Sequence, residues 1–240
     1  MASWAAFAGE RGPARHRPAA EVTRPTLAAL SSIGLVPVIM IDSPHDAVPL
    51  AEALLDGGIG CAEITFRTPA AAEAIAGISS TCRELLVGAG TVLTVEQAEQ
   101  ATQAGAQYVV APGFDPAVVG WCQERNVPVI PGVATPTEIS MALARGLSLL
   151  KFFPAEAMGG VQTLRAFSAP FASVRFIPTG GITAANLPQY LALPNVAACG
   201  GSWMAREDMI STGKFTEIAR LSRQARAIVR QVRGEPEVNR

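Results

Sequence analysis

The sequence predicts an α/β fold, a (β/α)8 TIM barrel of eight parallel strands and their helices, with an extra helix at the N-terminus. One observation is a repeat: from about residue 25, an apolar strand, a Gly/Pro/Thr turn and a segment of helical period recur at intervals of roughly 20–26 residues. Another is that the strands are continuous apolar runs, which is typical of parallel strands covered on both faces. The 240 residues, 49% of them hydrophobic, also suffice for one barrel domain.

Eight segments are predicted as strands. In chain order they are VPVIMI (36–41), CAEITFR (61–67), LLVGAG (85–90), YVVAP (108–112), PVIPGV (128–133), LLKFFP (149–154), RFIPTG (175–180) and VAACGG (196–201). The segments between them are predicted as helices, because several open on Ser, Thr or Asp and close on Gly or Asn, which cap helix ends. Before the first strand, TLAALSSIG predicts the extra helix, in a position to cap the bottom of the barrel.

The barrel domain is expected to span residues 25–233. The preceding residues, 1–24, are rich in Ala, Arg, Gly and Pro, lack sustained periodicity, and are expected to form a disordered extension. Their Arg cluster follows a weak apolar stretch, which is the reverse of the order in a secretory signal. A C-terminal tail is expected at 234–240.

The last helical pattern runs from about Ala205 to Arg233. Its apolar stripe at helical spacing is expected to face the core, through Ile218, Leu221, Ala225, Ile228 and Val232. A row of arginines opposite is interpreted as the solvated outer face of the final helix: Arg220, Arg223, Arg226, Arg230 and Arg233. A basic face that binds an anionic partner is the alternative.

The composition excludes several classes of function. With 19 Lys+Arg against 20 Asp+Glu, the chain has no electrostatic footprint for nucleic acid. No apolar run approaches the ~18 residues of a membrane-spanning helix, so no membrane partner is expected. The four cysteines show no C-x-x-C spacing and are interpreted as buried thiols of a cytoplasmic protein. With only His16 and His45, a metal site built on several histidines cannot form, and no metal or cofactor is expected.

Charged residues within two predicted strands mark a candidate catalytic site. Glu63, Thr65 and Arg67 alternate along the second strand and therefore share one face. Lys151 stands in L-L-K-F-F-P, where burying an ammonium without compensation costs several kcal/mol and favours the neutral, nucleophilic amine. Such an amine is what Schiff-base formation with a ketone requires. The alternatives are a simple Glu63–Arg67 pair and a lysine that extends to solvent at a strand edge.

Glycine pairs follow the last two predicted strands, in P-T-G-G-I and G-G-S-W. Backbone N–H groups of such loops can approach an anion closely. Barrels often bind phosphate after strands seven and eight. We therefore expect Gly180, Gly181, Gly201 and Ser202 to bind a phosphate group.

Seven motifs at the strand ends together resemble one known family. They are E-I-T-F-R-T (63–68), V-G-A-G-T-V (87–92), A-P-G-F (111–114), P-G-V-A-T-P-T-E (131–138), K-F-F-P-A-E (151–156), P-T-G-G-I (178–182) and G-G-S-W (200–203). The sequence from about 25 to 210 resembles the 2-keto-3-deoxy-6-phosphogluconate (KDPG) and 4-hydroxy-2-oxoglutarate (KHG) aldolase family, class I.

The resemblance implies a role for each matching residue. Lys151 would be the Schiff-base lysine and Glu63 the general acid/base. The pyruvate carboxylate would be held by Arg67 and Thr91, and Phe153 would line the pocket. Pro112 would shape the pocket wall, and Thr179 would contact the substrate hydroxyls. The glycine loops and Ser202 would hold the substrate phosphate. The family commonly forms trimers, so the resemblance also implies a homotrimer.

The reaction implied is cleavage of KDPG to pyruvate and D-glyceraldehyde 3-phosphate, a step of the Entner–Doudoroff pathway in carbohydrate metabolism. KHG, which yields pyruvate and glyoxylate, and 2-dehydro-3-deoxy-6-phosphogalactonate are alternative substrates of the same lysine chemistry. Two further alternatives are a phosphosugar isomerase or epimerase, which would need more histidines than the chain has, and a non-catalytic phosphate-binding barrel.

Overall fold

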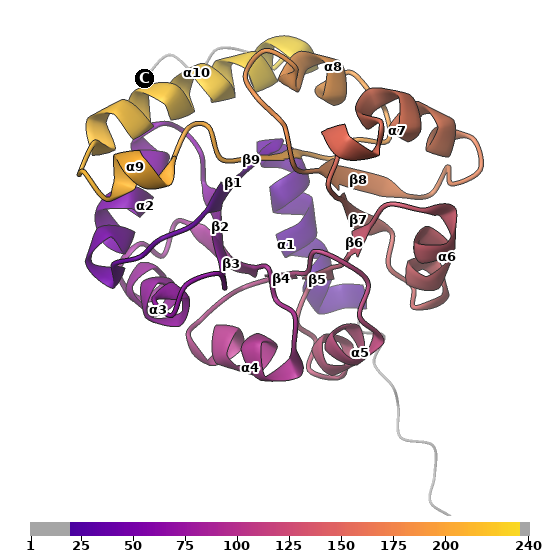
Figure 1. The fold of residues 1–240 in the computed structure, drawn as a ribbon, viewed down its shortest axis with the longest axis horizontal. Helices are drawn as coiled ribbons and strands as arrows, with labels where there is room; N and C mark the ends of the chain where they lie inside the picture. Colours follow the sequence, from indigo (N-terminus) through magenta and orange to yellow (C-terminus); the bar gives the residue numbers. More distant parts are fainter. Residues whose placement is uncertain (1–19, 236–240) are drawn as a thin grey trace, which may run out of the picture.

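The computed structural model describes residues 20–235 and shows a ring of parallel strands surrounded by helices (Figure 1). The strands are β1 (Leu35–Ile39), β2 (Cys61–Thr65), β3 (Leu86–Gly90), β4 (Val109–Val110), β5 (Val129–Ile130), β6 (Gly132–Val133), β7 (Leu149–Phe152), β8 (Arg175–Pro178) and β9 (Cys199–Gly201). The helices are α1 (Ala20–Ile33), α2 (Ala47–Asp56), α3 (Ala71–Thr81), α4 (Val95–Gln103), α5 (Pro116–Glu124), α6 (Pro136–Ala144), α7 (Gly160–Ser168), α8 (Leu187–Leu191), α9 (Glu207–Ile210) and α10 (Phe215–Arg233), with 3-10 turns η1 (Pro44–Asp46) and η2 (Glu156–Met158). The predicted α/β barrel class is confirmed.

The strands pair in the order expected of a barrel. One sheet runs β5-β4-β3-β2-β1-β9 and the other β6-β7-β8, all parallel. The two sheets are continuous through Pro131, which separates β5 from β6 and whose carbonyl accepts a 2.9 Å hydrogen bond from the Lys151 N–H. The predicted strand 128–133 is thus broken in two, because Pro131 has no N–H to donate to the ladder.

The ring closes between β8 and β9 through isolated bridges rather than a full ladder. Phe176 pairs with Val196, and Thr179 pairs with Gly200. The Ala197 N–H also donates to the Phe176 carbonyl at 2.8 Å. The last predicted strand, 196–201, is therefore shorter as a regular strand, although its first residues still join the barrel.

Helix caps at the carboxyl side of the strands agree with the predicted helix starts. The Thr94 side chain accepts from the Gln97 N–H at the start of α4, and Asp115 accepts from two N–H groups at the start of α5. At α6, Thr135 and Glu138 form a reciprocal capping box. These contacts fix where each loop of the barrel mouth ends.

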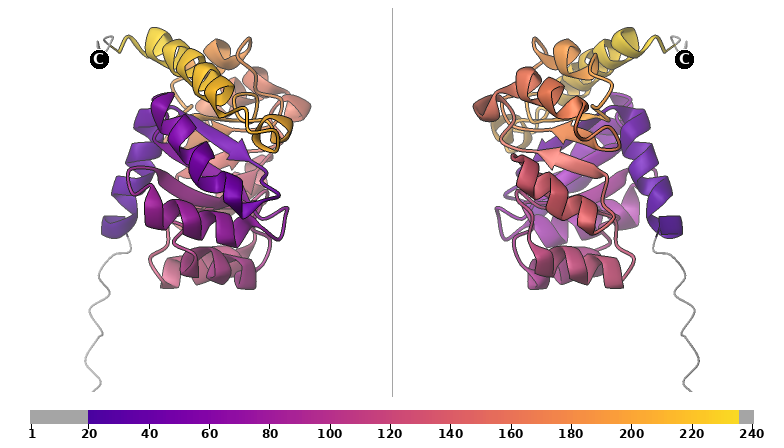
Figure 2. Two further views of the ribbon diagram at one scale, coloured as in Figure 1. Left: turned by 90° about the vertical axis from the view of Figure 1, so that its left-hand side faces the viewer. Right: turned by 90° about the vertical axis from the view of Figure 1, so that its right-hand side faces the viewer.

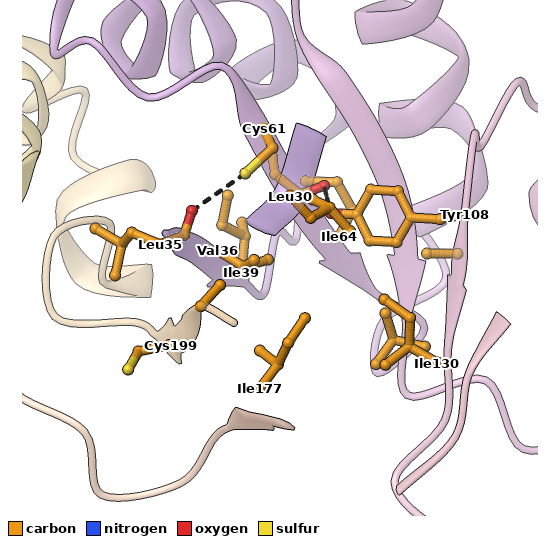
Figure 3. Close-up of a cluster of buried hydrophobic side chains, with 14 of the residues drawn as sticks. Leu30, Leu35, Val36, Ile39, Cys61, Ile64, Tyr108, Ile130, Ile177 and Cys199 are labelled. Atoms are coloured by element: carbon orange, nitrogen blue, oxygen red, sulfur yellow. Dashed lines mark hydrogen bonds between the residues drawn. The ribbon is translucent and has the colours of Figure 1, made fainter. Parts of the chain in front are cut away.

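Helix α1 closes the bottom of the barrel, as the sequence predicts. Figure 2 shows it lying across one end, away from the ends to which the strand arrows point. Its Leu30 is fully buried and lines a small internal cavity together with Val36, Tyr108 and Ile177. Figure 3 shows these side chains in the apolar interior, with the Tyr108 ring directed toward Leu30 and Ile64. Apart from this small cavity, which Glu63 and Lys151 also line, the interior below the mouth is packed.

The N-terminal boundary is corrected by the structure. Residues 20–24 belong to α1, whereas the sequence analysis placed them in a disordered extension. Ala and Glu, which open this segment, favour helical geometry, and the helix continues through Pro25. The expectation for residues 1–19 lies outside the described residues, as does most of the tail. At the other end, α10 ends at Arg233 with Gly234 in a left-handed conformation (φ +66°).

The arginine row of α10 is only partly a solvated face. Arg220 and Arg223 are exposed and pair with Glu217 and Asp56. Two other members turn inward, because they meet polar groups at the edge of the barrel. Arg226, 15% exposed, pairs with Glu235 at 2.7 Å. Arg233 donates to the carbonyls of Ser31, Ser32 and Ala197. The solvated interpretation was wrong for these two residues.

Candidate active site

A buried lysine and glutamate face each other inside the barrel. Lys151 in β7 and Glu63 in β2 lie 3.0 Å apart, Nζ to Oε1, and their side chains are 5% and 4% exposed. Two charges taken out of water cost several kcal/mol each unless they are paired. This pairing excludes both earlier alternatives: Glu63 pairs with Lys151 rather than Arg67, and Lys151 does not extend to solvent.

Glycines on neighbouring strands make room for the pair. A Cβ at Gly90, the register partner of Thr65, would lie 2.2 Å from Glu63 Oε1. A Cβ at Gly88, the partner of Glu63, would lie 2.4 Å from the Tyr108 ring. The motif V-G-A-G therefore supplies the space in which the glutamate and the tyrosine ring sit.

Tyr108 forms the floor beside the pair, and the sequence analysis did not single it out. Its hydroxyl donates to the Ala62 carbonyl at 2.9 Å, and its side chain is fully buried. Burial, and then the nearby Cys61 and Glu63, raise the pKa of this phenol well above its usual value. Tyr108 therefore stays protonated and donates one fixed hydrogen bond. The available signal was a tyrosine at the start of an otherwise aliphatic strand.

Above the pair, a cavity of about 840 Å³ opens at the carboxyl ends of β1, β2, β7, β8 and β9. Of the predicted site residues, it is lined by Arg67, Phe153, Thr179, Gly180, Gly181, Gly201 and Ser202. Lys151 Nζ lies 5.4 Å from the centre of the Phe153 ring, so the lysine adjoins the cavity wall from below. The structure thus brings predicted residues from the ends of four strands, β2, β7, β8 and β9, to one mouth.

Four predicted site residues do not line this cavity. Lys151 and Glu63 line the small internal cavity below it, whereas Thr91 and Pro112 line neither. Thr91 follows β3 and Pro112 follows β4, on the opposite side of the mouth. Thr91 has φ +56°, which is rare for a β-branched residue. The Pro112 carbonyl would lie 2.1 Å from a Cβ at Gly132, so Pro112 packs closely against the β6 backbone. Their assigned roles in substrate binding stay predictions.

The glycine loop after β8 is fixed with its N–H groups unused. Gly180 and Gly181 have φ +101° and +80°, which glycine adopts readily. Their carbonyls are engaged: Gly180 O accepts from the Glu156 N–H at 3.1 Å, and Gly181 O from Asn186 Nδ2 at 3.0 Å. Within residues 20–235, neither glycine N–H has an acceptor. Both remain available to an anion in the cavity.

Charged residues that the sequence analysis missed also line the cavity. They are Arg206, Glu207 and Asp208, next to Ser202 in the chain. No pattern separates them in sequence from an ordinary surface segment. No group of three or more His, Cys, Asp or Glu within residues 20–235 has a metal-binding arrangement. Within the same range, no helix is long and apolar enough to cross a membrane.

A buried amine held by a carboxylate beneath a cavity lined by glycine loops places the chain among barrel enzymes that react through a lysine. Comparison of the sequence with known proteins narrows this class to one family. A family model described as "KDPG and KHG aldolase" matches residues 27–221. The chain belongs to the KDPG and KHG aldolase family.

Named relatives agree with this assignment. The chain is 54% identical over 201 residues to a 2-dehydro-3-deoxy-phosphogluconate aldolase of Treponema pallidum (strain Nichols), covering 84% of this chain and 96% of the relative. It is 44% identical over 191 residues to the KHG/KDPG aldolase of Escherichia coli (strain K12), covering 80% and 90%. A crystal structure of KDPG aldolase from Legionella pneumophila, with pyruvate captured as a covalent carbinolamine intermediate, matches with a TM-score of 0.81 and 41% identity, covering 83% and 97%.

Proposed function

We propose that this protein is a class I aldolase that cleaves KDPG to pyruvate and D-glyceraldehyde 3-phosphate. The observation that carries the proposal is the buried 3.0 Å contact between Lys151 Nζ and Glu63 Oε1 beneath the cavity. A proton that passes along this contact leaves a neutral amine and a carboxylic acid. The neutral amine is the form that attacks a carbonyl carbon.

The cavity suits a chain with an anion at each end. Arg67 follows β2 and takes part in no ion pair within residues 20–235, so its guanidinium is free to bind the carboxylate next to the keto group. Gly180, Gly181, Gly201 and Ser202 offer neutral donors to the phosphate. Thr179, 6% exposed, lines the cavity beside the glycine loops, where it pairs with Gly200, and is placed to contact the substrate hydroxyls.

The reaction follows from these positions. Lys151 Nζ attacks C2 of the substrate, and Glu63 gives its proton to the departing hydroxyl, so that loss of water leaves a protonated imine and the Glu63 carboxylate. Glu63, directly or through a water, removes the proton of the C4 hydroxyl, the C3–C4 bond breaks, and its electrons enter the imine to give an enamine and the aldehyde. Glu63 then returns a proton to C3, and water hydrolyses the imine to release pyruvate and Lys151. The imine is the electron sink, so no metal is required.

Substrate choice within the family is part of the proposal. The glycine loops favour the phosphorylated substrate over KHG, because KHG has no phosphate: its second anion is a carboxylate on C4, closer to the reacting carbons than the phosphate on C6 of KDPG. The galactonate epimer differs at C4, next to Thr179 and Glu63. Relative kcat/KM values on the three compounds rank them, and a preference for KHG would contradict the proposed substrate.

The rival barrel functions lack the residues they need. Within residues 20–235 the single histidine is His45, an exposed residue of η1 that does not line the cavity. An isomerase that uses a histidine electrophile therefore has no candidate in this part of the chain. A non-catalytic phosphate-binding barrel would leave the buried Lys151–Glu63 pair without a role.

The biological setting is also proposed. Family membership supports a cytoplasmic homotrimer acting in the Entner–Doudoroff pathway. Light scattering should then give three times the 25.0 kDa chain mass. A monomeric mass would contradict the trimer without affecting the lysine chemistry.

Borohydride trapping tests the proposed chemistry. Incubation with pyruvate and borohydride should add one reduced pyruvate to the protein, on Lys151. The Lys151→Ala variant should gain no adduct and lose turnover. Lys214, exposed and the only other lysine, provides the matched control: the Lys214→Ala variant should still form the adduct and should keep wild-type turnover. An adduct on Lys214, or turnover near wild type in Lys151→Ala, would refute the proposal.

A further inference from the structure

An exposed ion pair at the cavity rim differs from the other surface pairs of the chain in where it lies. Arg206 and Asp208 form two hydrogen bonds of 2.8 Å, Nε to Oδ1 and Nη2 to Oδ2, with side chains 59% and 61% exposed. Both residues line the cavity with Ser202 and Gly201. Figure 1 shows α9, which Arg206 precedes, at the rim between α10 and β1.

The backbone keeps Arg206 close to the anion-binding loop. The Ala205 N–H donates to the Ser202 carbonyl at 3.1 Å, so one tight turn separates Ser202 from Arg206. Met204 and Ala205, within this turn, are buried and anchor it. The turn is fixed while the guanidinium at its end reaches solvent and the cavity.

The two arginines of the cavity stand at different ends of it. Arg67 follows β2 and Ser202 follows β9, with β1 between them. Two strand spacings separate these strand ends by roughly 10 Å. A substrate whose carboxylate is bound by Arg67 therefore directs its other anionic end toward Ser202 and Arg206.

We propose that Arg206 is the cationic ligand of the phosphate in this site, and that Asp208 holds it in a resting position when the site is empty. The proposal rests on the proposed function and adds a specificity-determining residue to it. An exposed arginine–carboxylate pair is weak in water. A phosphate dianion that is already bound by neutral N–H groups offers a stronger partner, and the guanidinium binds it through two parallel hydrogen bonds.

Opposite effects of the two partners test the proposal. Arg206→Gln should raise KM for KDPG about tenfold or more, the scale of a lost charge-assisted hydrogen bond, and leave kcat/KM for KHG unchanged. Asp208→Asn should lower KM for KDPG, because Arg206 no longer has to leave a partner. In the Arg206→Gln background, Asp208→Asn should have no such effect.

The control is Arg220→Gln, which removes a similar exposed arginine–glutamate pair on α10, away from the cavity. This variant should have wild-type KM and kcat/KM values for both KDPG and KHG. Equal losses on KDPG and KHG in Arg206→Gln would show that the pair only supports α9, and would overturn the proposal. So would a loss for Asp208→Asn as large as that for Arg206→Gln.

A binding experiment separates failure of this inference from failure of the proposed function. Inorganic phosphate, titrated calorimetrically into the wild-type protein, should bind, and Arg206→Gln should weaken that binding about tenfold. If neither substrate is cleaved but phosphate binding still depends on Arg206, the proposed reaction fails and the phosphate ligand stands. Equal phosphate binding by wild type and Arg206→Gln, or none by wild type, overturns the inference.

Discussion

Lys151 and Glu63 depend on each other, since each neutralises a charge that the interior would otherwise reject. Removing one partner of a buried pair costs on the order of 3–5 kcal/mol, because the other charge stays buried without compensation. The pair is thus weak as a source of stability but strongly constrained in position. Its 3.0 Å contact is set by two strands on opposite sides of the barrel interior.

Glu63→Gln should preserve shape and imine formation while slowing the proton transfers. Exchange of the pyruvate methyl protons into deuterated water should fall about 10²–10⁴-fold, the usual contribution of positioned acid–base catalysis. Proton NMR measures this rate. Glu124→Gln, on the exposed surface of α5, should exchange at the wild-type rate. Exchange at the wild-type rate in Glu63→Gln would mean that another group carries the proton.

At the scale of the element, the glycine loops are shaped by what surrounds them. A Cβ at Gly201 would lie 1.9 Å from the Trp203 ring, and a Cβ at Gly181 would lie 2.4 Å from Glu156. The side of Gly201 that a substituent would occupy therefore faces Trp203 rather than an anion. Glycine is required here by packing, and the proposed phosphate would use the N–H side.

Ser202→Ala and Gly201→Val should therefore differ in kind. Loss of the Ser202 hydroxyl removes one neutral hydrogen bond, worth roughly 0.5–1.5 kcal/mol, and should raise KM for phosphorylated substrate alone. Gly201→Val should displace Trp203 and reduce thermal stability and the turnover of both KDPG and KHG. Thermal melts and kinetics on the two substrates measure this. Equal losses on both substrates for Ser202→Ala would place the phosphate elsewhere.

The capping box of α6 gives a prediction about stability and pH. Glu138 accepts from the Ala134 and Thr135 N–H groups at 2.8 Å and from Thr135 Oγ1 at 2.9 Å. Burial alone would raise the pKa of Glu138, but these hydrogen bonds lower it overall. Glu138→Ala should cost about 1 kcal/mol of unfolding free energy at neutral pH, a typical capping contribution.

The pH dependence of that cost follows from the lowered pKa. The carboxylate contributes fully above the ordinary glutamate pKa of ~4.3 and loses its contribution as the pH falls through the folded-state pKa. The difference in denaturant midpoint between wild type and Glu138→Ala should therefore shrink in acid. A difference that stays constant from neutral pH into acid would contradict this account.

Local signals predicted most elements, and long-range contacts explain what they missed. Apolar runs located the strands, and Asp and Thr cap residues located the starts of α5 and α6. The missing N–H of Pro131 was a signal for the break between β5 and β6, although 128–133 was predicted as one strand. The Lys151–Glu63 contact joins residues 88 positions apart, and only their burial in apolar strands pointed to it. The roles of Arg226 and Arg233 could not be read from helical spacing, because their partners lie outside their own helix.

At the scale of the whole molecule, the four cysteines are all free and buried, as the sequence predicts. Burial raises the pKa of Cys122 to about 12, against an opposing effect of Arg125. Burial also raises the pKa of Cys61 and Cys199. Thiolate, the reactive form, is therefore scarce at neutral pH.

A thiol-specific disulfide reagent should consequently react slowly with the native protein. After unfolding in denaturant, it should titrate all four cysteines quickly. The absorbance of the thiol released from the reagent measures how many cysteines react, and how fast, in the native and in the unfolded protein. Fast reaction of one or more cysteines in the native state would show that the interior opens more readily than its packing indicates.

Arg233 joins the two ends of the described chain. It donates to the Ser31 and Ser32 carbonyls at the end of α1, and to the Ala197 carbonyl just before β9. A protein is synthesised from its N-terminus, so α1 leaves the ribosome long before this arginine is made. The carbonyls at the end of α1 therefore lack this partner until the last turn of α10 has been synthesised. Chains that are terminated just before Arg233 should lack these hydrogen bonds between α10, α1 and the segment before β9. They should be degraded faster than chains that are terminated just after it.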